Sequence, residues 1–210
     1  MTLRGVFVTG TDTGVGKTLA AACLVRAWTA HYWKPVQTGL ADEAGDSATV
    51  ATLADVPPER LIPPRHALLA PLAPQAAAVR EGVTIALDDF ALPAAAPLVV
   101  EGAGGVLVPL TADALMVDLM VRLGLPVVVV ARTALGTINH TLLTLEALRA
   151  RRLSVAGIIL SGPPDAGNRA AIESFGAVRV LAELPQLPRI DAEAVARLAA
   201  DRIPPLESLS

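Results

Sequence analysis

Short apolar runs recur along the chain and alternate with longer segments in which Ala and Leu are mixed with polar residues. The clearest runs are 6–8, 126–131 and 155–160, and each is rich in valine or isoleucine. Runs of about five apolar residues are typical of strands buried on both faces, whereas the longer segments are typical of helices. Because the two alternate, we expect an α/β fold with right-handed βαβ units, in which helices flank a mostly parallel sheet in three layers.

The pattern predicts where the individual elements lie. Strands are expected near 6–8, 32–33, 98–101, 126–131, 155–160 and 178–181, and helices near 18–29, 47–54, 114–122, 138–151, 168–175 and 192–200. Residues 57–97 interrupt the alternation, because prolines separate short helical pieces there. We expect this stretch to form an irregular cap over one end of the sheet. No repeat or linker divides the chain, so residues 1–210 are expected to form one domain.

Composition changes this picture little. Apolar residues make up 53% of the chain and the mean hydropathy is +0.54, which raises the question of a membrane protein. The excess lies in short runs of Ala, Leu and Val, however, and none approaches the roughly 18 apolar residues that a membrane helix requires. Residues 1–4 lead directly into the first strand without the features of a secretion signal. The lone cysteine, Cys23, is expected to be a core residue in a reducing cytoplasm.

Charge and aromatic content argue against a polynucleotide partner. The formal net charge is −3 and aromatic residues make up 3% of the chain. A basic surface and stacking side chains are the usual means of binding nucleic acid, and this sequence is poor in both. We therefore expect neither a nucleic-acid nor a membrane partner.

The stretch 5–18 reads GVFVTGTDTGVGKT and has the strand, loop and helix order of a P-loop. Its loop contains three glycines: Gly10, Gly14 and Gly16. Glycines let backbone N–H groups approach a phosphate chain closely, and the following helix adds its positive N-terminal end. Lys17 can then reach the β- and γ-phosphates, and the Thr18 hydroxyl can ligate Mg²⁺. The stretch predicts a nucleoside triphosphate site.

One position departs from the strict motif. The pattern G-x-x-x-x-G-K-[ST] requires glycine at position 11, where this chain has Thr11, and its glycine lies one place earlier at Gly10. The stretch can therefore also be read as a glycine-rich turn that only joins a strand to a helix. The Gly-Lys-Thr sequence and both flanks favour phosphate binding.

Polar residues follow other predicted strands, at the edge of the sheet where ligands bind in such folds. Lys34 and Thr38 come after the second strand, and Glu101 ends the strand 98–101. An acid in that place is typical of a Walker-B-like element that holds Mg²⁺. Asp46 precedes the predicted helix 47–54.

Each of these residues also has a plainer interpretation. Lys34 is compatible with a solvated lysine, and Glu101 with a charged residue in a glycine turn. The P-loop upstream favours the functional interpretation for both. For Asp46 the residues alone favour a helix N-cap over a metal ligand.

Four blocks, taken in order, closely resemble the dethiobiotin synthetase family. They are GTDTGVGKT (10–18), KPVQTG (34–39), VEGAGG (100–105) and LGTINHTLLT (135–144). The resemblance covers most of the chain and is weakest across 57–97 and 186–210. It implies a P-loop enzyme of biotin synthesis. Such an enzyme uses ATP, Mg²⁺ and CO₂ to close the ureido ring of dethiobiotin on 7,8-diaminononanoate (diaminopelargonate).

The resemblance also implies residue roles. Lys17 and Lys34 would be catalytic, with Lys17 along the β- and γ-phosphates and Lys34 neutralising the transferring phosphoryl group and the carbamate. Thr18, Asp46 and Glu101 would provide or orient Mg²⁺ ligands. For Asp46 the resemblance thus reverses the preference for a cap.

Further contacts follow from the same blocks. Thr13 and Thr38 would contact the diamine or carbamate, although each also suits a turn. The implied nucleotide site comprises Gly14, Val15, Gly16, Lys17, Thr18, Leu19, Asp46, Glu101, Gly102, Ala103, Gly104, Pro185, Gln186 and Leu187.

Three differences from the family limit this transfer. Gly14 stands where some relatives have Glu, so any contact of that carboxylate with an amine is missing. The interval from Lys17 to Lys34 is short, which indicates a trimmed connection. Ser161-Gly162 stands where relatives that read adenine have Asn-Asp. Since serine cannot pair with adenine at two points, we expect a relaxed preference among nucleoside triphosphates.

The resemblance implies a homodimer, and two other classes remain as alternatives. His140 has no catalytic role in this interpretation and belongs either to an interface or to the core. A MinD/ParA-like regulatory ATPase would carry a second lysine where this chain has Asp12. The synthetase part of a cobyrinate-type amidating enzyme would require a nucleophilic cysteine, and only Cys23 is present.

Overall fold

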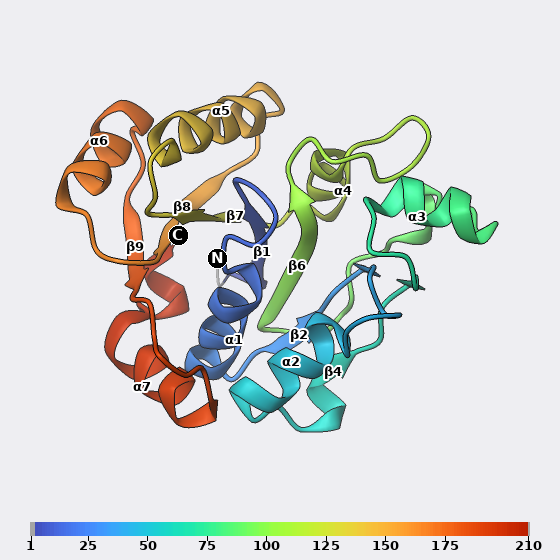
Figure 1. Cartoon of the computed structure of the whole chain (residues 1–210), viewed down its shortest axis with the longest axis horizontal. Coiled ribbons are helices and arrows are strands. Elements are labelled where there is room, and N and C mark those ends of the chain that lie inside the picture. Colours follow the sequence, from blue (N-terminus) through green and yellow to red (C-terminus); the bar gives the residue numbers. More distant parts are fainter. Residues whose placement is uncertain (1–2, 210) are drawn as a thin grey trace.

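A seven-stranded sheet runs through the centre of the computed structural model, which describes residues 3–209 (Figure 1). Its order is β4-β2-β6-β1-β7-β8-β9, and every pair of neighbouring strands is parallel. The strands are β1 (Gly5–Gly10), β2 (His31–Trp33), β4 (Leu61–Ile62), β6 (Leu98–Gly105), β7 (Val127–Arg132), β8 (Val155–Ser161) and β9 (Val180–Leu184). The polarity of every strand brings its carboxyl end to the same edge, where ligands bind in open α/β sheets.

Helices cover both faces of the sheet. On one face α1 (Lys17–Trp28) packs against α2 (Gly45–Ala54) and α7 (Ala192–Arg202). The other face carries α4 (Met116–Leu123), α5 (Thr137–Ala150) and α6 (Ala166–Gly176) (Figure 1). These three layers confirm the predicted α/β fold class.

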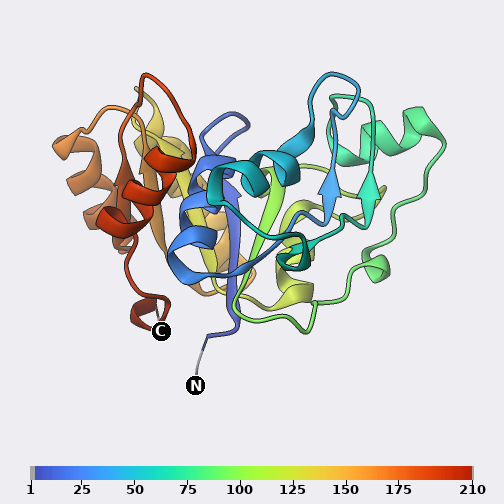
Figure 2. The same cartoon turned by 90° about the horizontal axis from the view of Figure 1, so that it is seen from below.

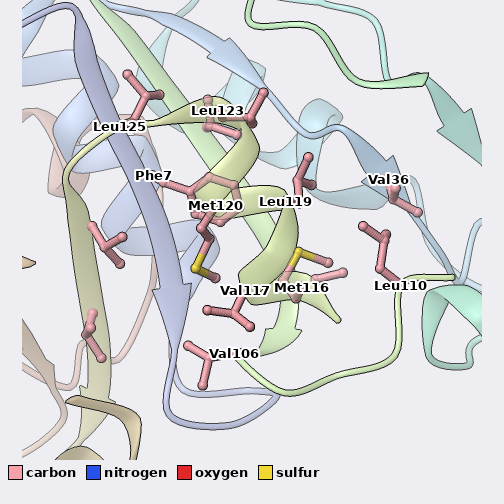
Figure 3. Close-up of a cluster of buried hydrophobic side chains, with 14 of the residues drawn as sticks. Phe7, Val36, Val106, Leu110, Met116, Val117, Leu119, Met120, Leu123 and Leu125 are labelled. Atoms are coloured by element: carbon pink, nitrogen blue, oxygen red, sulfur yellow. The ribbon is translucent and has the colours of Figure 1, made fainter. Parts of the chain in front are cut away.

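The strand side chains alternate between two apolar clusters, one on each face. Val6 and Val8 of β1 lie in the cluster beneath α1, whereas Phe7 lies in the cluster beneath α4. Figure 3 shows Phe7 among side chains of α4, including Met120 and Leu119. Burial on both faces explains why the strands read as unbroken apolar runs and not as alternating patterns.

Two strand predictions need correction. We expected β6 to end at Glu101, but the strand continues to Gly105, and Gly105 pairs with Gly10 of β1. The glycines of this extension also allow close packing between strands. A Cβ on Gly102 would lie 2.9 Å from the Phe7 ring. The last strand was expected at 178–181 and lies at Val180–Leu184.

Residues 57–97 contain more regular structure than expected. β4 is an edge strand of the main sheet, and β5 (His66–Ala67) pairs with β3 (Val36–Gln37) in a separate ladder (Figure 2). Both strands have two residues, which is too short to be seen in a pattern. The remaining pieces of this stretch are α3 (Pro74–Glu81) and the 3₁₀ turns Pro58–Arg60 and Leu87–Asp89. A further 3₁₀ turn, Leu206–Leu209, follows α7. Within residues 3–209, no helix has the length and hydropathy needed to cross a bilayer.

Candidate functional site

The loop between β1 and α1 folds over the head group of Lys17. Lys17 Nζ donates to the Asp12 carbonyl at 2.9 Å, and Gly16, with φ of 94°, is the N-cap of α1. A Cβ on Gly10 would lie 2.8 Å from the Asp12 carbonyl oxygen and 3.1 Å from Lys17 Nζ. The loop therefore has the tight path and the helix start that a phosphate site requires.

The shifted glycine has a simple structural explanation. The Thr11 amide donates to the Val130 carbonyl at 3.0 Å, which extends the pairing of β1 with β7 beyond Gly10. The extra residue is thus taken up by the strand and not by the loop.

Lys34 lies directly after β2 and is almost completely buried, with 3% of its surface exposed. Its ammonium group is 2.7 Å from Asp46 Oδ2 and 3.1 Å from Glu101 Oε1, and it donates to the Gly102 carbonyl at 3.0 Å. Each of its three N–H groups thus has an acceptor. The alternative of a solvated lysine is wrong.

The pKa values of Lys17 and Lys34 are shifted in opposite directions. Burial lowers the pKa of Lys17, and the neighbouring charge of Lys34 lowers it further. Burial also disfavours the charge on Lys34, but Glu101 and Asp46 outweigh it and raise the pKa of this ammonium group. The protein therefore stabilises the charge of Lys17 less than that of Lys34. A polyanion bound next to Lys17 would stabilise its charge.

Asp46 and Thr18 complete the cluster. Thr18 Oγ1 donates to Asp46 Oδ1 at 2.6 Å and lies 3.2 Å from Glu101 Oε1. Burial would raise the pKa of Asp46, but Lys34 and the Thr18 hydrogen bond hold it below its usual value. Asp46 sits in the first turn of α2 and the N-cap is Ala44, so the interpretation of Asp46 as the N-cap is wrong.

Sequence reasoning missed two residues of this network. Gln37 of β3 accepts from the Asp46 amide at 2.9 Å and donates to the Thr38 carbonyl at 2.9 Å. It thereby caps α2 from a neighbouring strand, since Ala44 has no capping side chain. The hydroxyl of Tyr32, buried in β2, donates to Glu101 Oε2 at 2.9 Å. A tyrosine in a predicted strand was the available signal, because a buried hydroxyl requires a partner.

A cavity of about 490 Å³ opens over this cluster. Its lining includes most of the phosphate and metal residues expected from the sequence. The lining residues are Thr13, Gly14, Gly16, Lys17, Thr18, Lys34, Gln37, Thr38, Glu43, Asp46, Glu101, Ala103 and Gly104. A second cavity of about 530 Å³ shares Thr13 and Thr38 with the first and is closed by Pro71 and Pro74 of the cap. Thr13 and Thr38 thus lie where the two cavities meet.

Other expected residues lie outside the first cavity. Val15 is buried beneath the loop and Leu19 packs against the core below α1. Pro185, Gln186 and Leu187 follow β9, on the far side of β8 from the P-loop.

Ser161 and Gly162 lie between the P-loop and β9. Ser161 pairs with Leu184 of β9, and the Gly162 amide donates to the Leu184 carbonyl at 2.9 Å. A Cβ on Gly16 would lie 2.6 Å from Ser161 Oγ, so this hydroxyl packs against the P-loop. His140 is exposed and lines a third cavity of about 300 Å³ with Leu143. The assignment of His140 to the core is therefore wrong.

The oxygens at the first cavity fit magnesium. Across residues 3–209, no group of three or more His, Cys, Asp and Glu side chains is placed to hold a metal. Mg²⁺ bound with a nucleotide needs less, namely one or two carboxylates together with phosphate oxygens and water. Asp46, Glu101 and the Thr18 hydroxyl meet this requirement.

Comparisons with known proteins agree with this geometry. The family model described as "AAA domain" matches residues 4–194. A protein of Bordetella avium named "Biotin biosynthesis bifunctional protein BioCD" is 63% identical over 98% of this chain, which spans 44% of that longer protein. "ATP-dependent dethiobiotin synthetase BioD" of Paramagnetospirillum magneticum is 54% identical, over 93% of this chain and 95% of that protein. The protein of the same name from Novosphingobium aromaticivorans is 50% identical over 92% of the chain.

Solved structures support the fold alone. A ParA family ATPase from Chlorobium tepidum aligns with a TM-score of 0.55 at 14% identity, over 95% of this chain and 99% of that one. Chloroplast FtsY from Physcomitrella patens aligns with a TM-score of 0.50 at 14% identity, over 94% of this chain and 65% of that one.

Proposed function

This chain belongs to the ATP-dependent dethiobiotin synthetase family, and we propose that the cluster around Lys34 carries out that family's reaction. The reaction is the carboxylation and ring closure of 7,8-diaminononanoate with CO₂ and ATP, giving dethiobiotin, ADP and phosphate. The observation that carries the proposal is the meeting of two buried lysines, two carboxylates and a P-loop at one cavity.

The chemistry requires two anions to approach each other. A carbamate formed on one substrate amine attacks the γ-phosphorus, and the bond from this phosphorus to the bridging oxygen breaks to release ADP. The second amine then attacks the carbonyl carbon of the mixed anhydride, which expels phosphate and closes the ring. Fixed positive charge between carbamate and γ-phosphate lowers the barrier of the first step, because negative charge is spread over both groups in its transition state.

Lys34 is placed to supply that charge. Its ammonium group is held by three acceptors and is raised in pKa, so it stays protonated. A preorganised cation needs little rearrangement as the transition state forms. Lys17, under the P-loop, neutralises the β- and γ-phosphates and keeps the nucleotide in register with Lys34.

Magnesium completes the site in this proposal. Thr18, Asp46 and Glu101 would hold or orient the ion, and the bound ion would neutralise phosphate charge during transfer. The nucleotide phosphates follow the loop from Gly14 to Gly16 into the N-terminus of α1. Ala103 and Gly104 form the wall beside them, whereas Gly102, which precedes them in β6, is buried. Pro185, Gln186 and Leu187 follow β9, on the side assigned to the base.

The second cavity suits the diamine. It starts at Thr13 and Thr38, next to Lys34, and runs beneath the cap past Pro71 to Pro74. This shape allows a polar end at the reaction centre and an apolar chain under the cap. We also propose a cytoplasmic homodimer. Leu107 and Leu143, both about half exposed beside the third cavity, offer an apolar surface for its interface.

The site weakens both alternative functions. Asp12 occupies the position of the second lysine of MinD/ParA-like ATPases and lies 3.6 Å from Arg132. Cys23 is completely buried, and burial raises its pKa to about 12, so it cannot act as the nucleophile of an amidating enzyme.

Phosphate release tests the proposal. The protein is incubated with Mg-ATP alone, with the addition of bicarbonate, and with bicarbonate plus 7,8-diaminononanoate, and dethiobiotin is measured by mass spectrometry. We expect release to depend on both co-substrates and to match dethiobiotin formation one to one. Release that does not respond to the diamine would contradict the proposal and favour a regulatory ATPase.

A further inference from the structure

Tyr32 is the one tyrosine of the chain and is completely buried in β2. Its hydroxyl donates to Glu101 Oε2 at 2.9 Å. The ring belongs to the apolar cluster beneath α1, together with Val99 of the adjoining β6 and Val8 of β1. Such packing leaves the ring little freedom, so the hydroxyl is held at a fixed point below Glu101.

The two oxygens of Glu101 therefore have different surroundings. Oε1 faces the cavity cluster, where Lys34 Nζ lies at 3.1 Å and Thr18 Oγ1 at 3.2 Å. Oε2 faces the core and receives the Tyr32 hydrogen bond. Tyr32 thus holds Oε2 in place, while Oε1 faces the cavity.

We propose that Tyr32 is a positioning residue that limits Glu101 to one metal-facing oxygen and so favours Mg²⁺ over the larger Ca²⁺. This inference rests on the proposed function, since it takes Glu101 to be a metal ligand. Mg²⁺ demands a small octahedral shell, which a carboxylate enters through a single oxygen. Ca²⁺ accepts more ligands and commonly takes both oxygens of one carboxylate. Turning Oε2 towards the cavity would break the buried hydrogen bond to Tyr32 and leave its hydroxyl without a partner.

The test compares metal affinities of wild type and Tyr32→Phe without relying on turnover. Each protein is loaded with Mn²⁺ and a non-hydrolysable ATP analogue, in the absence of diamine and bicarbonate. Mg²⁺ and Ca²⁺ then displace Mn²⁺, which is followed by electron paramagnetic resonance. We expect Tyr32→Phe to raise the affinity for Ca²⁺ relative to Mg²⁺ by about tenfold.

Two further variants separate positioning from a general structural effect. Thr141→Val removes another buried hydroxyl, in α5, which has no hydrogen-bond partner among residues 3–209. It should leave the Ca²⁺ to Mg²⁺ ratio unchanged. In a Glu101→Gln background, Tyr32→Phe should no longer alter the ratio, because its effect passes through the carboxylate. An unchanged ratio in Tyr32→Phe alone would overturn the inference, as would the same change in both backgrounds.

A second measurement needs no substitution and remains decisive if Tyr32→Phe fails to fold. Growth with 3-fluorotyrosine labels position 32 alone and gives one ¹⁹F resonance. With the nucleotide analogue bound, we expect Mg²⁺ to leave the resonance in place and Ca²⁺ to shift it, because Ca²⁺ attracts the oxygen that Tyr32 holds. Equal responses to the two ions would overturn the inference. A failure of the proposed function would instead appear as wild-type phosphate release that is independent of the diamine.

Discussion

The carboxyl edge of the sheet is built differently on the two sides of β1. On the β2 and β6 side, Tyr32, Lys34 and Glu101 are buried and bonded to one another. On the β7 and β8 side, the corresponding edge carries Ser161 and Gly162, which are partly exposed and joined to β9 by backbone contacts. The first side fixes charges in space, whereas the second presents small and uncharged residues.

Energetics explain why the two sides tolerate change differently. Removing one member of a buried ion pair leaves its partner uncompensated, at a cost of roughly 3–5 kcal/mol. A small side chain at a strand end makes no comparable interaction. We infer that the charged side determines rate and metal binding, and that the other side contributes little selectivity for the base.

The largest effect is expected from the loss of Lys34. Lys34→Ala should lower kcat by at least about a thousandfold with a smaller change in KM, because this cation acts mainly in the transition state. Lys17→Ala should also abolish turnover. Steady-state kinetics with Mg-ATP, bicarbonate and diamine measure both, and circular dichroism checks the fold. Arg26→Ala is the control, because it also removes one cation but from a largely exposed pair with Asp55. A near wild-type kcat for Lys34→Ala would contradict the inference that the charged side determines the rate.

An intermediate effect is expected at Gln37, which supports the charged side without bearing charge. Gln37→Ala removes the acceptor of the Asp46 amide and should lower activity or metal affinity by about 10–100-fold. The Mg²⁺ concentration for half-maximal activity should rise accordingly. Thr49→Ala is the matched control, because Thr49 lies on the exposed face of α2, the helix that contains Asp46. If both variants behave alike, Gln37 has no positioning role.

A small effect is expected on the other side of β1. The kcat/KM values for ATP, CTP and GTP should agree within about tenfold, because Ser161 packs on Gly16 and cannot pair with a base at two points. Ser161→Ala should leave the three values almost unchanged. A hundredfold preference for ATP would show that this side reads the base after all.

The smallest effect on the protein at neutral pH is expected from substitution of Cys23, a buried residue of α1. Burial raises the pKa of this thiol from 9.0 to about 12, so between these values the unfolded chain releases a proton that the folded one keeps. The free energy of unfolding should therefore fall as pH rises above about 9. Cys23→Ala should weaken this dependence and change little at pH 7. Urea unfolding of both proteins from pH 7 to 10.5 measures it, and identical slopes would contradict it.

Local signals were enough to predict that Lys17, Thr18, Lys34 and Glu101 lie at one edge of the sheet. Lys17 and Thr18 belong to a continuous motif, and Lys34 and Glu101 stand at the ends of apolar runs whose edge the parallel topology fixes. Tyr32 and Gln37 could not be predicted in the same way. Their partners lie on other strands and helices, and nothing in the spacing of the residues encodes those contacts.

The fold shows the same limit. Long apolar runs predicted the central strands, but β3, β4 and β5 have two residues each and depend on tertiary pairing. The extension of β6 through Gly102 to Gly105 was hidden because glycine is usually a turn signal. Here it serves close packing against Phe7.

The sequence has lysine at positions 17 and 34 and nowhere else. Both side chains are buried at the cavity, and the cationic side chains elsewhere are arginines, which acylating reagents for amines do not attack. Acetylation or glycation of a lysine in this protein is therefore always a modification at this cavity. Selective ¹⁵N-lysine labelling turns this into an advantage, because every side-chain ammonium signal then reports on the cavity that holds Lys17 and Lys34.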